Sequence, residues 1–229
     1  MFKRRAQRVL WRVLPLIQFV RYGRPNPIEP WDSDDAFREV MERVQDHTVV
    51  DKVRCYMLWQ WLRTVLPLEG DVAEVGVYRG GTARLLGEAL GDSGKTLHLF
   101  DTFCGMPETD PQRDYHERGE FDDTSLDAVR AFLQGLDRVA FHPGRFPASA
   151  TTVRESRFCF VHVDVDIYRS VFDCCSFFYP RLTSGGLLVF DDYGFVTCPG
   201  AKEAVDEFFA GTRDVPCYLP TGQCVVRKH

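Results

Sequence analysis

FCFVHVDVDIYRSV, residues 158–171, joins an apolar run directly to a pair of acids. The apolar part is typical of a buried strand, and only Val165 separates Asp164 from Asp166. A buried carboxylate is costly unless a cation or a hydrogen-bond donor meets it. The following residues, 168–178, have the pattern of a helix. The stretch therefore indicates an α/β protein with a chemically active group at the end of a strand.

The alternation of strand and helix recurs along most of the chain. We expect strands at 71–77, 96–101, 138–144, 158–164 and 186–192, and helices at 34–46, 51–66, 82–90, 124–135, 168–178 and 201–210. This order predicts a mostly parallel sheet with helices on both faces. The end of the chain, VPCYLPTGQCVVRKH, indicates a hairpin that would add antiparallel edge strands.

Composition limits the class of protein. The chain has 229 residues, 45% of them hydrophobic, and a formal net charge of −5. The mild acidity argues against a nucleic-acid partner, which usually needs a basic surface. The eight cysteines form no CxxC pair and no zinc-finger spacing. We therefore expect free thiols, no metal held by sulfur, and a cytoplasmic location.

The N-terminal segment, MFKRRAQRVLWRVLPLIQFVRYGR, is basic and then apolar. Arg12 interrupts the apolar run, which is too short to span a bilayer, and no small-residue cleavage site follows. We expect residues 1–33 to form a helix and a linker, with the helix covering the core or a neighbouring subunit. A basic amphipathic surface anchor is the alternative. Residues 34–229 should form one domain with a lid loop at 103–123.

Acidic residues lie at the ends of four predicted strands. They are Glu74, Asp101, Asp164, Asp166, Asp191 and Asp192. Ligands of open α/β sheets bind outside the carboxyl ends of the strands, so these groups should meet at one rim. Core packing does not explain the arrangement, because like charges repel. The competing interpretation gives each acid a separate task in helix capping, turn formation or solvation.

A hard divalent cation such as Mg²⁺ fits three carboxylates with room for water. Asp191 and Asp192 point in opposite directions in an ideal strand, so shared ligation requires the chain to turn after Phe190. If the preceding strand stays extended, one face of it carries Phe158, Phe160, His162, Asp164 and Asp166. We expect His162 to be a core histidine bonded to backbone, with a position behind the acids as the alternative. His116 and His142 are expected in lid or surface roles.

The first turn, AEVGVYRGGTARLL, is glycine-rich but is not GxGxxG. Tyr78 stands where dinucleotide folds place a second glycine to admit a pyrophosphate, which disfavours an oxidoreductase. The turn therefore suits a nucleoside-like ligand better than a polyphosphate. Asp101, at the end of the next strand, can accept hydrogen bonds from ribose hydroxyls.

EVGVYRGGTARLL, LFDTFCGMPETD, HVDVDIYRSV, YPRLTSGGLLVFDDYG and GAKEAVDEFF are similar to motifs of the macrocin O-methyltransferase family. Its members use S-adenosylmethionine to methylate sugar hydroxyls of macrolides and related antibiotics. The resemblance runs from about Thr48 to about Phe209. It implies a Rossmann-like class I methyltransferase with a mostly parallel seven-stranded sheet, an antiparallel C-terminal hairpin, a helical N-terminal extension and a Mg²⁺ requirement.

The resemblance also implies roles for particular residues. Asp164, Asp191 and Asp192 would be the metal ligands, and Asp166 would be the general base that takes the hydroxyl proton. The residues expected at the cofactor are Thr48, Glu74, Gly76, Tyr78, Gly80, Asp101, Thr102, Phe103, Asp123, Ser125, Gly144, Phe146 and Asp164. The acceptor would be a small natural product, and the enzyme a homo-oligomer without nucleic-acid or membrane contact.

The sequence leaves two other functions open. The same fold could methylate a phenol or a carboxylate of a natural product or peptide. Alternatively, the protein could bind the cofactor without catalysis and order another biosynthetic enzyme. The full set of acids at the strand ends argues against this second alternative, because a degenerate pocket would be free to lose them.

Overall fold

The computed structural model describes residues 29–229, and its contacts group the chain into two units, Met1–Glu39 and Val40–His229. The first unit contains the short 3-10 helix η1 (Pro30–Asp32) and the start of helix α2 (Asp35–Val44). Helix α2 ends within the second unit. The basic helix expected at the N-terminus lies outside the described residues.

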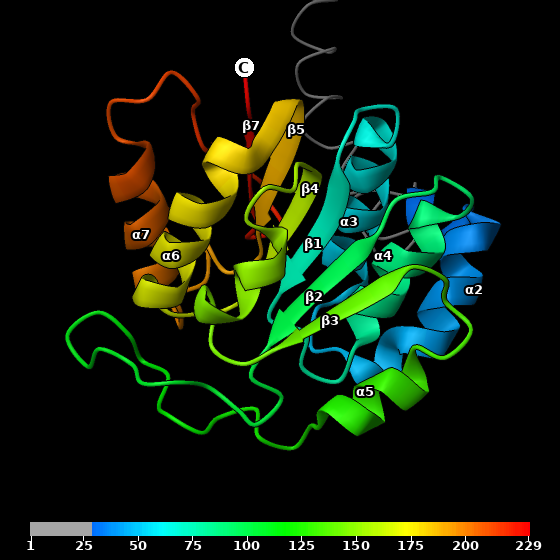
Figure 1. The fold of residues 1–229 in the computed structure, drawn as a ribbon, viewed down its shortest axis with the longest axis horizontal. Coiled ribbons are helices and arrows are strands. Elements are labelled where there is room, and N and C mark those ends of the chain that lie inside the picture. Colours follow the sequence, from blue (N-terminus) through cyan, green and yellow to red (C-terminus); the bar gives the residue numbers. More distant parts are fainter. Residues whose placement is uncertain (1–28) are drawn as a thin grey trace, which may run out of the picture. The chain divides into compact units, whose positions relative to one another are not determined.

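In the described part of the chain, seven strands form one sheet in the order β3-β2-β1-β4-β5-β7-β6 (Figure 1). They are β1 (Asp71–Val75), β2 (Leu97–Asp101), β3 (Val139–Pro143), β4 (Phe158–Val163), β5 (Leu182–Phe190), β6 (Cys217–Tyr218) and β7 (Cys224–Arg227). The first five are parallel to one another, and β7 runs antiparallel to β5 and β6. This confirms the predicted fold class, with the terminal hairpin at one edge of the sheet.

Helices cover both faces of this sheet. They are α3 (Lys52–Val65), α4 (Gly81–Leu90), α5 (Leu126–Phe132), α6 (Tyr168–Phe178) and α7 (Pro199–Phe209), with short 3-10 turns η2 (Gln45–His47), η3 (Ala148–Val153) and η4 (Tyr179–Arg181). Helices α3 and α4 pack on one face, and α6 and α7 on the other (Figure 1). The connections between strand ends and helix starts therefore meet along the carboxyl edge of the sheet, where ligands of such folds bind.

Local sequence explains where the helices begin. Asp51 caps α3, because its side chain accepts hydrogen bonds from the backbone N–H groups of Val53 and Arg54 at 2.9 and 3.1 Å. Ser125 caps α5 by accepting from the N–H of Ala128 at 3.2 Å, so this helix starts later than expected. The residues Val53, Met57, Leu58, Trp61, Leu62 and Val65 of α3 recur at helical spacing, which predicts that they belong to the core. Leu58, Leu62 and Val65 are buried as predicted, but Val53, Met57 and Trp61 are only half-buried, and Cys55, Tyr56 and Trp59 are buried as well. Apolar residues surround much of this helix, so periodicity does not locate its inner face.

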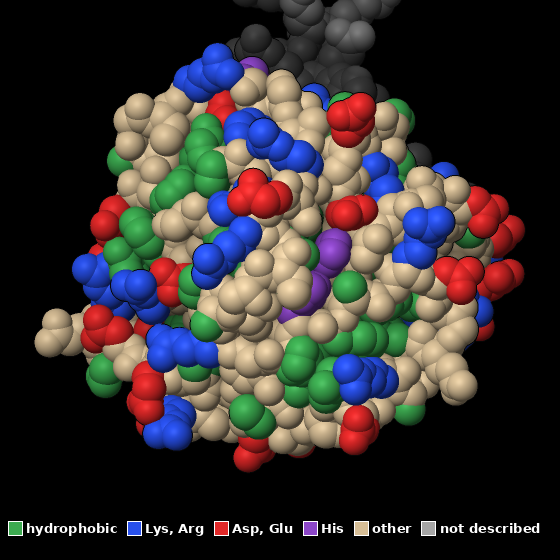
Figure 2. Space-filling view, in the orientation of Figure 1, with side chains coloured by type: hydrophobic (Ala, Val, Ile, Leu, Met, Phe, Trp, Pro, Cys, Tyr) green, Lys and Arg blue, Asp and Glu red, His purple; other side chains and the backbone are tan. Residues whose placement is uncertain are grey.

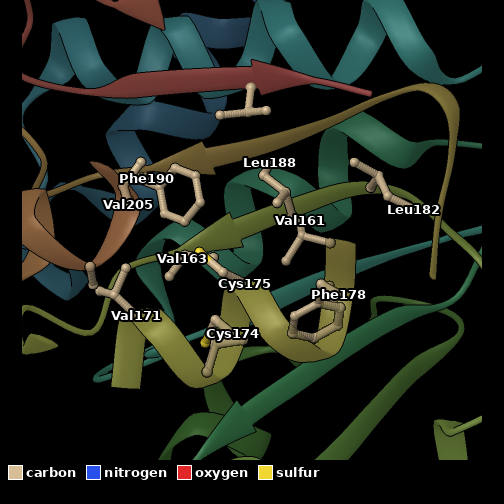
Figure 3. Close-up of a cluster of buried hydrophobic side chains, with 14 of the residues drawn as sticks. Val161, Val163, Val171, Cys174, Cys175, Phe178, Leu182, Leu188, Phe190 and Val205 are labelled. Atoms are coloured by element: carbon tan, nitrogen blue, oxygen red, sulfur yellow. The ribbon is translucent and has the colours of Figure 1, made fainter. Parts of the chain in front are cut away.

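One hydrophobic core lies between strands β4 and β5 and helix α6. Figure 3 shows Val161, Leu188 and Phe190 facing Cys174 and Phe178, all fully or nearly fully buried. Each of the large side chains contributes about 1.5–3 kcal/mol when removed from water.

One predicted face of β4 is wrong. Phe158 joins the cluster of Val161 and Val163, whereas Phe160 does not. The pairing of β4 with β5 shifts register between Phe158 and Phe160, and this irregularity moves the first residue of the strand to the opposite face.

All eight cysteines are free thiols, as expected from their spacing. Among the described residues, no helix combines the length and the apolar character needed to cross a membrane.

His98 and His142 meet where β2 pairs with β3. Histidine side chains reach the surface near the middle of the side of the molecule that Figure 2 shows. His98 Nδ1 lies 3.0 Å from His142 Nε2, and His98 Nε2 lies 3.3 Å from a carboxylate oxygen of Asp71. Burial lowers the pKa of both rings, to about 4 for His142, where His98 adds repulsion.

This pair predicts acid destabilisation. Because the folded pKa of His142 is about 4 and its unfolded value is about 6.5, the unfolded state binds the extra proton between these values. Stability should therefore fall as the pH falls from 6.5 toward 4. Part of the ring is exposed to solvent, which weakens the effect. We therefore expect His142→Gln to remove about 1 kcal/mol of the decrease in the free energy of unfolding over this pH range. Urea unfolding at pH 7 and pH 5 measures the difference, and an unchanged pH slope in the variant would contradict it.

Candidate active site

A cleft with an empty volume of about 950 Å³ lies at the carboxyl edge of the sheet. Its apolar walls are Val49, Val50, Val75, Phe100, Met106, Pro107, Phe121, Phe146 and Val165, and its polar lining includes Arg54, Tyr78, Asp101, Thr102, Arg145 and Ser170. Four aspartates, Asp164, Asp166, Asp191 and Asp192, line one part of it.

The four aspartates come from the ends of β4 and β5. Strand β5 ends at Phe190, and the chain turns there, as joint use of Asp191 and Asp192 requires. One carboxylate oxygen from each of Asp164, Asp191 and Asp192 lies within 4.8 Å of the other two. Asp191 is fully buried and Asp192 nearly so. The structure thus brings together the acids that the sequence places at separate strand ends.

Asp191 has partners that the sequence analysis missed. Arg54, on α3, forms an ion pair with one oxygen of this carboxylate, and Gln223 donates a hydrogen bond to the other at 2.8 Å. Arg54 lies 137 positions from Asp191 in the chain, and Gln223 lies 32 positions away. The sequence feature that points toward Arg54 is the N-cap at Asp51, because it starts α3 near the carboxyl edge of the sheet.

His162 stands behind the acids, and the expectation of backbone bonding is wrong. Its Nδ1 lies 2.9 Å from Glu74 Oε1, and its Nε2 lies 3.6 Å from an oxygen of Asp191. All three side chains are fully buried. Glu74 and His162 are direct partners in the β1–β4 pairing, which brings their side chains to the same face. The alternative interpretation, a histidine behind the acids, is therefore the correct one.

Charge is unevenly balanced within this group. Burial opposes ionisation of Asp191, but its ion-pair contacts with His162 and Arg54 outweigh burial, so its pKa is lowered. Burial opposes protonation of His162, but Asp191 and Glu74 raise its pKa well above the usual value. Burial raises the pKa of Asp164 and Asp192 well above normal, and neighbouring carboxylates raise it further. Arg54 and His162 therefore balance the charge of Asp191, whereas a further cation could still bind between Asp164 and Asp192.

Close backbone approach sets the position of Asp164. A Cβ atom on Gly76 would lie 1.7 Å from the backbone oxygen of Asp164, so only glycine fits between β1 and the end of β4. Two residues later the chain is left-handed, with φ 58° at Asp166. Such a backbone costs of order 1 kcal/mol in a residue other than glycine and is concentrated at functional sites. The Asp166 N–H donates to Asp192 Oδ2 at 3.0 Å, which holds the two acids in fixed relation.

Asp101 fastens the first turn to the second strand. One of its oxygens accepts from the N–H groups of Val77 and Tyr78 at 2.6 and 3.0 Å, and the other accepts from Phe103 at 2.7 Å. A carboxylate has about four acceptor positions, so capacity for one more donor remains.

The residues expected at the cofactor divide into two groups. Those that line the cleft are Gly76, Tyr78, Asp101, Thr102, Gly144, Phe146 and Asp164. Those that do not are Thr48, Glu74, Gly80, Phe103, Asp123 and Ser125. Three members of the second group bond to other parts of the protein. Glu74 contacts His162, Asp123 forms an ion pair with Arg79, and Ser125 caps α5.

The segment expected to be a lid, 103–123, contains no helix or strand and runs below α6 and α7 in Figure 1. Asp114 anchors it, because its Oδ1 accepts from the N–H of Tyr168, the first residue of α6, at 2.8 Å. Two residues later, His116 Nε2 lies 3.6 Å from Asp166 Oδ1. The segment therefore reaches the candidate base from a distant part of the chain.

Comparison with known proteins identifies the relatives of this chain. The model of the family described as Macrocin-O-methyltransferase (TylF) matches residues 26–216. The chain belongs to the macrocin O-methyltransferase family. It is therefore an O-methyltransferase, as the sequence motifs indicate.

Curated relatives of this macrocin-type O-methyltransferase act on antibiotics. The chain is 30% identical over 224 residues, 91% of its length and 82% of the relative's, to a Streptomyces olivaceus enzyme named 8-demethyl-8-(2,3-dimethoxy-alpha-L-rhamnosyl)-tetracenomycin-C 4'-O-methyltransferase. It is 33% identical over 180 residues, 71% of its length and 70% of the relative's, to mycinamicin III 3''-O-methyltransferase of Micromonospora griseorubida. Among solved structures, the O-methyltransferase NovP matches with a TM-score of 0.70 at 26% identity, covering 80% of this chain and 82% of that one.

The contact between Gly76 and Asp164 yields a matched test. Gly76→Ala should displace the end of β4 and lower the free energy of unfolding by about 2–4 kcal/mol, as overpacking and backbone strain add. Gly94→Ala is the control, because Gly94 also has a positive φ, 75°, but nothing lies within 4 Å of an added Cβ. It should cost only about 1–2 kcal/mol. Urea unfolding measures both, and equal losses would show that the close approach does not matter.

Proposed function

We propose that this O-methyltransferase transfers a methyl group from S-adenosylmethionine to a sugar hydroxyl of a natural product, with Mg²⁺ at Asp164, Asp191 and Asp192 and with Asp166 as general base. The observation that carries the proposal is the convergence of these four acids in one cleft, with three of their oxygens mutually within 4.8 Å. Family membership supports the methyl transfer, and the donor set supports the metal.

The residues present fit a hard cation. The three candidate ligands offer only carboxylate oxygens, which Mg²⁺ prefers. One oxygen from each lies within 4.8 Å of the other two, so a single cation between them could contact all three. Arg54 and Gln223 would hold Asp191 from behind, as outer partners commonly orient ligating carboxylates.

The cleft also fits the methyl donor. Gly76 and Tyr78 border it beside Asp101, which retains acceptor capacity for a ribose hydroxyl. Phe100 and Phe146, whose ring centroids lie 5.4 Å apart, provide an apolar wall for an adenine ring. When bound, S-adenosylmethionine supplies the methyl group, and Mg²⁺ lowers the pKa of the acceptor hydroxyl.

The chain's own residues would move the proton and exclude water. Asp166 would accept the proton of the hydroxyl, and its left-handed backbone and its bond to Asp192 would keep the carboxylate in place. The segment 103–123, tied to α6 by Asp114, would close one side of the cleft through Met106, Pro107 and Phe121. A closed, dry site strengthens every electrostatic contact inside it.

A sugar acceptor is favoured by the relatives, since two of them are named for methylation at the numbered positions 4' and 3'' of glycosylated antibiotics or their precursors. A phenol or carboxylate acceptor remains the second candidate. We also propose a cytoplasmic enzyme, because eight free cysteines suit a reducing compartment. That the enzyme is a homo-oligomer without nucleic-acid or membrane contact stays a prediction. Light scattering tests the oligomeric state, and binding assays test the two kinds of contact.

The role of Asp166 predicts a selective loss of turnover. Asp166→Asn should lower kcat by about 10²–10⁴-fold, since general-base assistance contributes that much, while binding of S-adenosylhomocysteine stays unchanged. Asp173→Asn is the control, because Asp173 lies on α6 and pairs with the exposed Arg169. Turnover by Asp166→Asn close to that of the control would remove Asp166 as the base.

The metal role predicts sensitivity to chelators. EDTA should abolish turnover, and added Mg²⁺ should restore it, because a neutral hydroxyl needs help to lose its proton. Binding of S-adenosylhomocysteine should persist in EDTA, which separates loss of metal from loss of fold. A rate that does not respond to EDTA would contradict the metal and favour an acceptor that is already anionic, such as a carboxylate.

A further inference from the structure

A second group of metal-binding side chains lies beside the first. His116 of the segment 103–123, Asp166 after β4, and Cys198 at the start of α7 each offer one ligand atom. His116 Nε2 lies 3.5 Å from Cys198 Sγ, and Cys198 Sγ lies 3.5 Å from Asp166 Oδ1. The third edge, from His116 Nε2 to Asp166 Oδ1, is 3.6 Å.

These three distances match one face of a zinc tetrahedron. Zinc binds sulfur at about 2.3 Å, imidazole nitrogen at about 2.0–2.1 Å and carboxylate oxygen at about 2.0–2.2 Å. At tetrahedral angles these lengths place sulfur about 3.5–3.7 Å from nitrogen or oxygen, and nitrogen about 3.3–3.5 Å from oxygen. Both observed edges to Cys198 Sγ, 3.5 Å each, match, and the nitrogen–oxygen edge of 3.6 Å needs only a slight side-chain shift.

Glu120 supplies a second, independent feature of a metal site. Its Oε2 lies 2.5 Å from His116 Nδ1. A carboxylate only accepts, so Nδ1 carries the hydrogen, and Nε2 is directed at Cys198 and Asp166. The N–H of Glu117 donates to the other oxygen of Glu120 at 3.2 Å, which orients the carboxylate. Histidine ligands of metals commonly donate their other nitrogen to a carboxylate in this way.

We propose that His116, Cys198 and Asp166 form a binding site for Zn²⁺, separate from the all-oxygen site of Asp164, Asp191 and Asp192, and that Zn²⁺ bound there inhibits the enzyme. The nitrogen, sulfur and oxygen set suits a borderline-soft cation and discriminates against Mg²⁺. This proposal departs from the expectation of no metal held by sulfur, which stays untested. Cysteine spacing could not indicate the site, because its ligands come from three separate segments.

Access and proton balance are consistent with binding. The side chains of His116 and Asp166 are 18% and 19% exposed, so a water molecule can complete the fourth position. Cys198 is buried and binds as thiolate, so the S–H bond breaks, the Zn–S bond forms, and one proton leaves to solvent.

Inhibition follows from what the ion would occupy. A Zn²⁺ ligated by Asp166 removes that carboxylate from proton transfer and ties the segment 103–123 to α7. The inhibition, but not the binding, depends on the proposed role of Asp166 as base. Measuring binding and turnover separately therefore distinguishes failure of the zinc site from failure of the proposed function.

The binding experiment uses the purified protein with excess Mg²⁺ to fill the oxygen site. We expect one Zn²⁺ per chain in a competition titration with a chromophoric chelator. Co²⁺ in place of Zn²⁺ should give a thiolate-to-cobalt charge-transfer absorption. Cys198→Ser should abolish that absorption and weaken Zn²⁺ binding at least tenfold. Glu120→Gln, which keeps all three ligands, should weaken binding by about 10–100-fold.

Cys217→Ser is the matched control, because Cys217 is an exposed thiol outside the cluster, and it should leave binding and absorption unchanged. If Cys198→Ser fails to fold, His116→Gln tests the same site through a ligand that is partly exposed to solvent. Zinc binding unaffected by both Cys198→Ser and His116→Gln would overturn the proposal. Loss of binding in Asp192→Asn alone would also overturn it, since the ion would then sit in the oxygen site.

The turnover experiment adds Zn²⁺ at constant excess Mg²⁺. Wild-type and Cys217→Ser should lose at least tenfold in rate at the zinc concentration that fills the site, whereas Cys198→Ser should keep its own zinc-free rate. Equal inhibition of Cys198→Ser and wild type would overturn the inhibitory role.

Discussion

Concentrated negative charge at the carboxyl edge of the sheet is the constraint on which the rest of the site depends. Asp164, Asp191 and Asp192 bring oxygens within 4.8 Å of one another where water is largely excluded. Isolated buried charges of one sign would destabilise the fold. Arg54 and His162 offset this cost at Asp191. The negative charge of the remaining acids is what a divalent cation would balance in the proposed function.

Strand pairing provides the precision that this charge cluster needs. The pairing of β1 with β4 brings Glu74 beside His162, and Gly76 permits the ends of the two strands to approach closely. Asp191 is held from the opposite side by α3 and by Gln223 near the terminal hairpin. Four elements thus meet around the carboxylate of Asp191.

Two groups of candidate metal ligands lie next to each other at Asp166. One consists only of carboxylate oxygens, and the other combines imidazole, thiol and carboxylate. The segment 103–123 contributes His116 to the second environment and apolar side chains to the cleft. Its position therefore places one segment against both the candidate base and the apolar walls of the cleft.

Sequence alone determined the order of strands and helices, because hydrophobic periodicity and cap residues such as Asp51 and Ser125 act over a few positions. It also predicted that acids at strand ends would meet, since parallel strands place their carboxyl ends together. It could not find Arg54, Gln223 or the bond between His162 and Glu74, and it placed Phe158 on the wrong face of β4. Those features depend on register and on contacts between segments up to 137 positions apart, which only the packed tertiary structure decides.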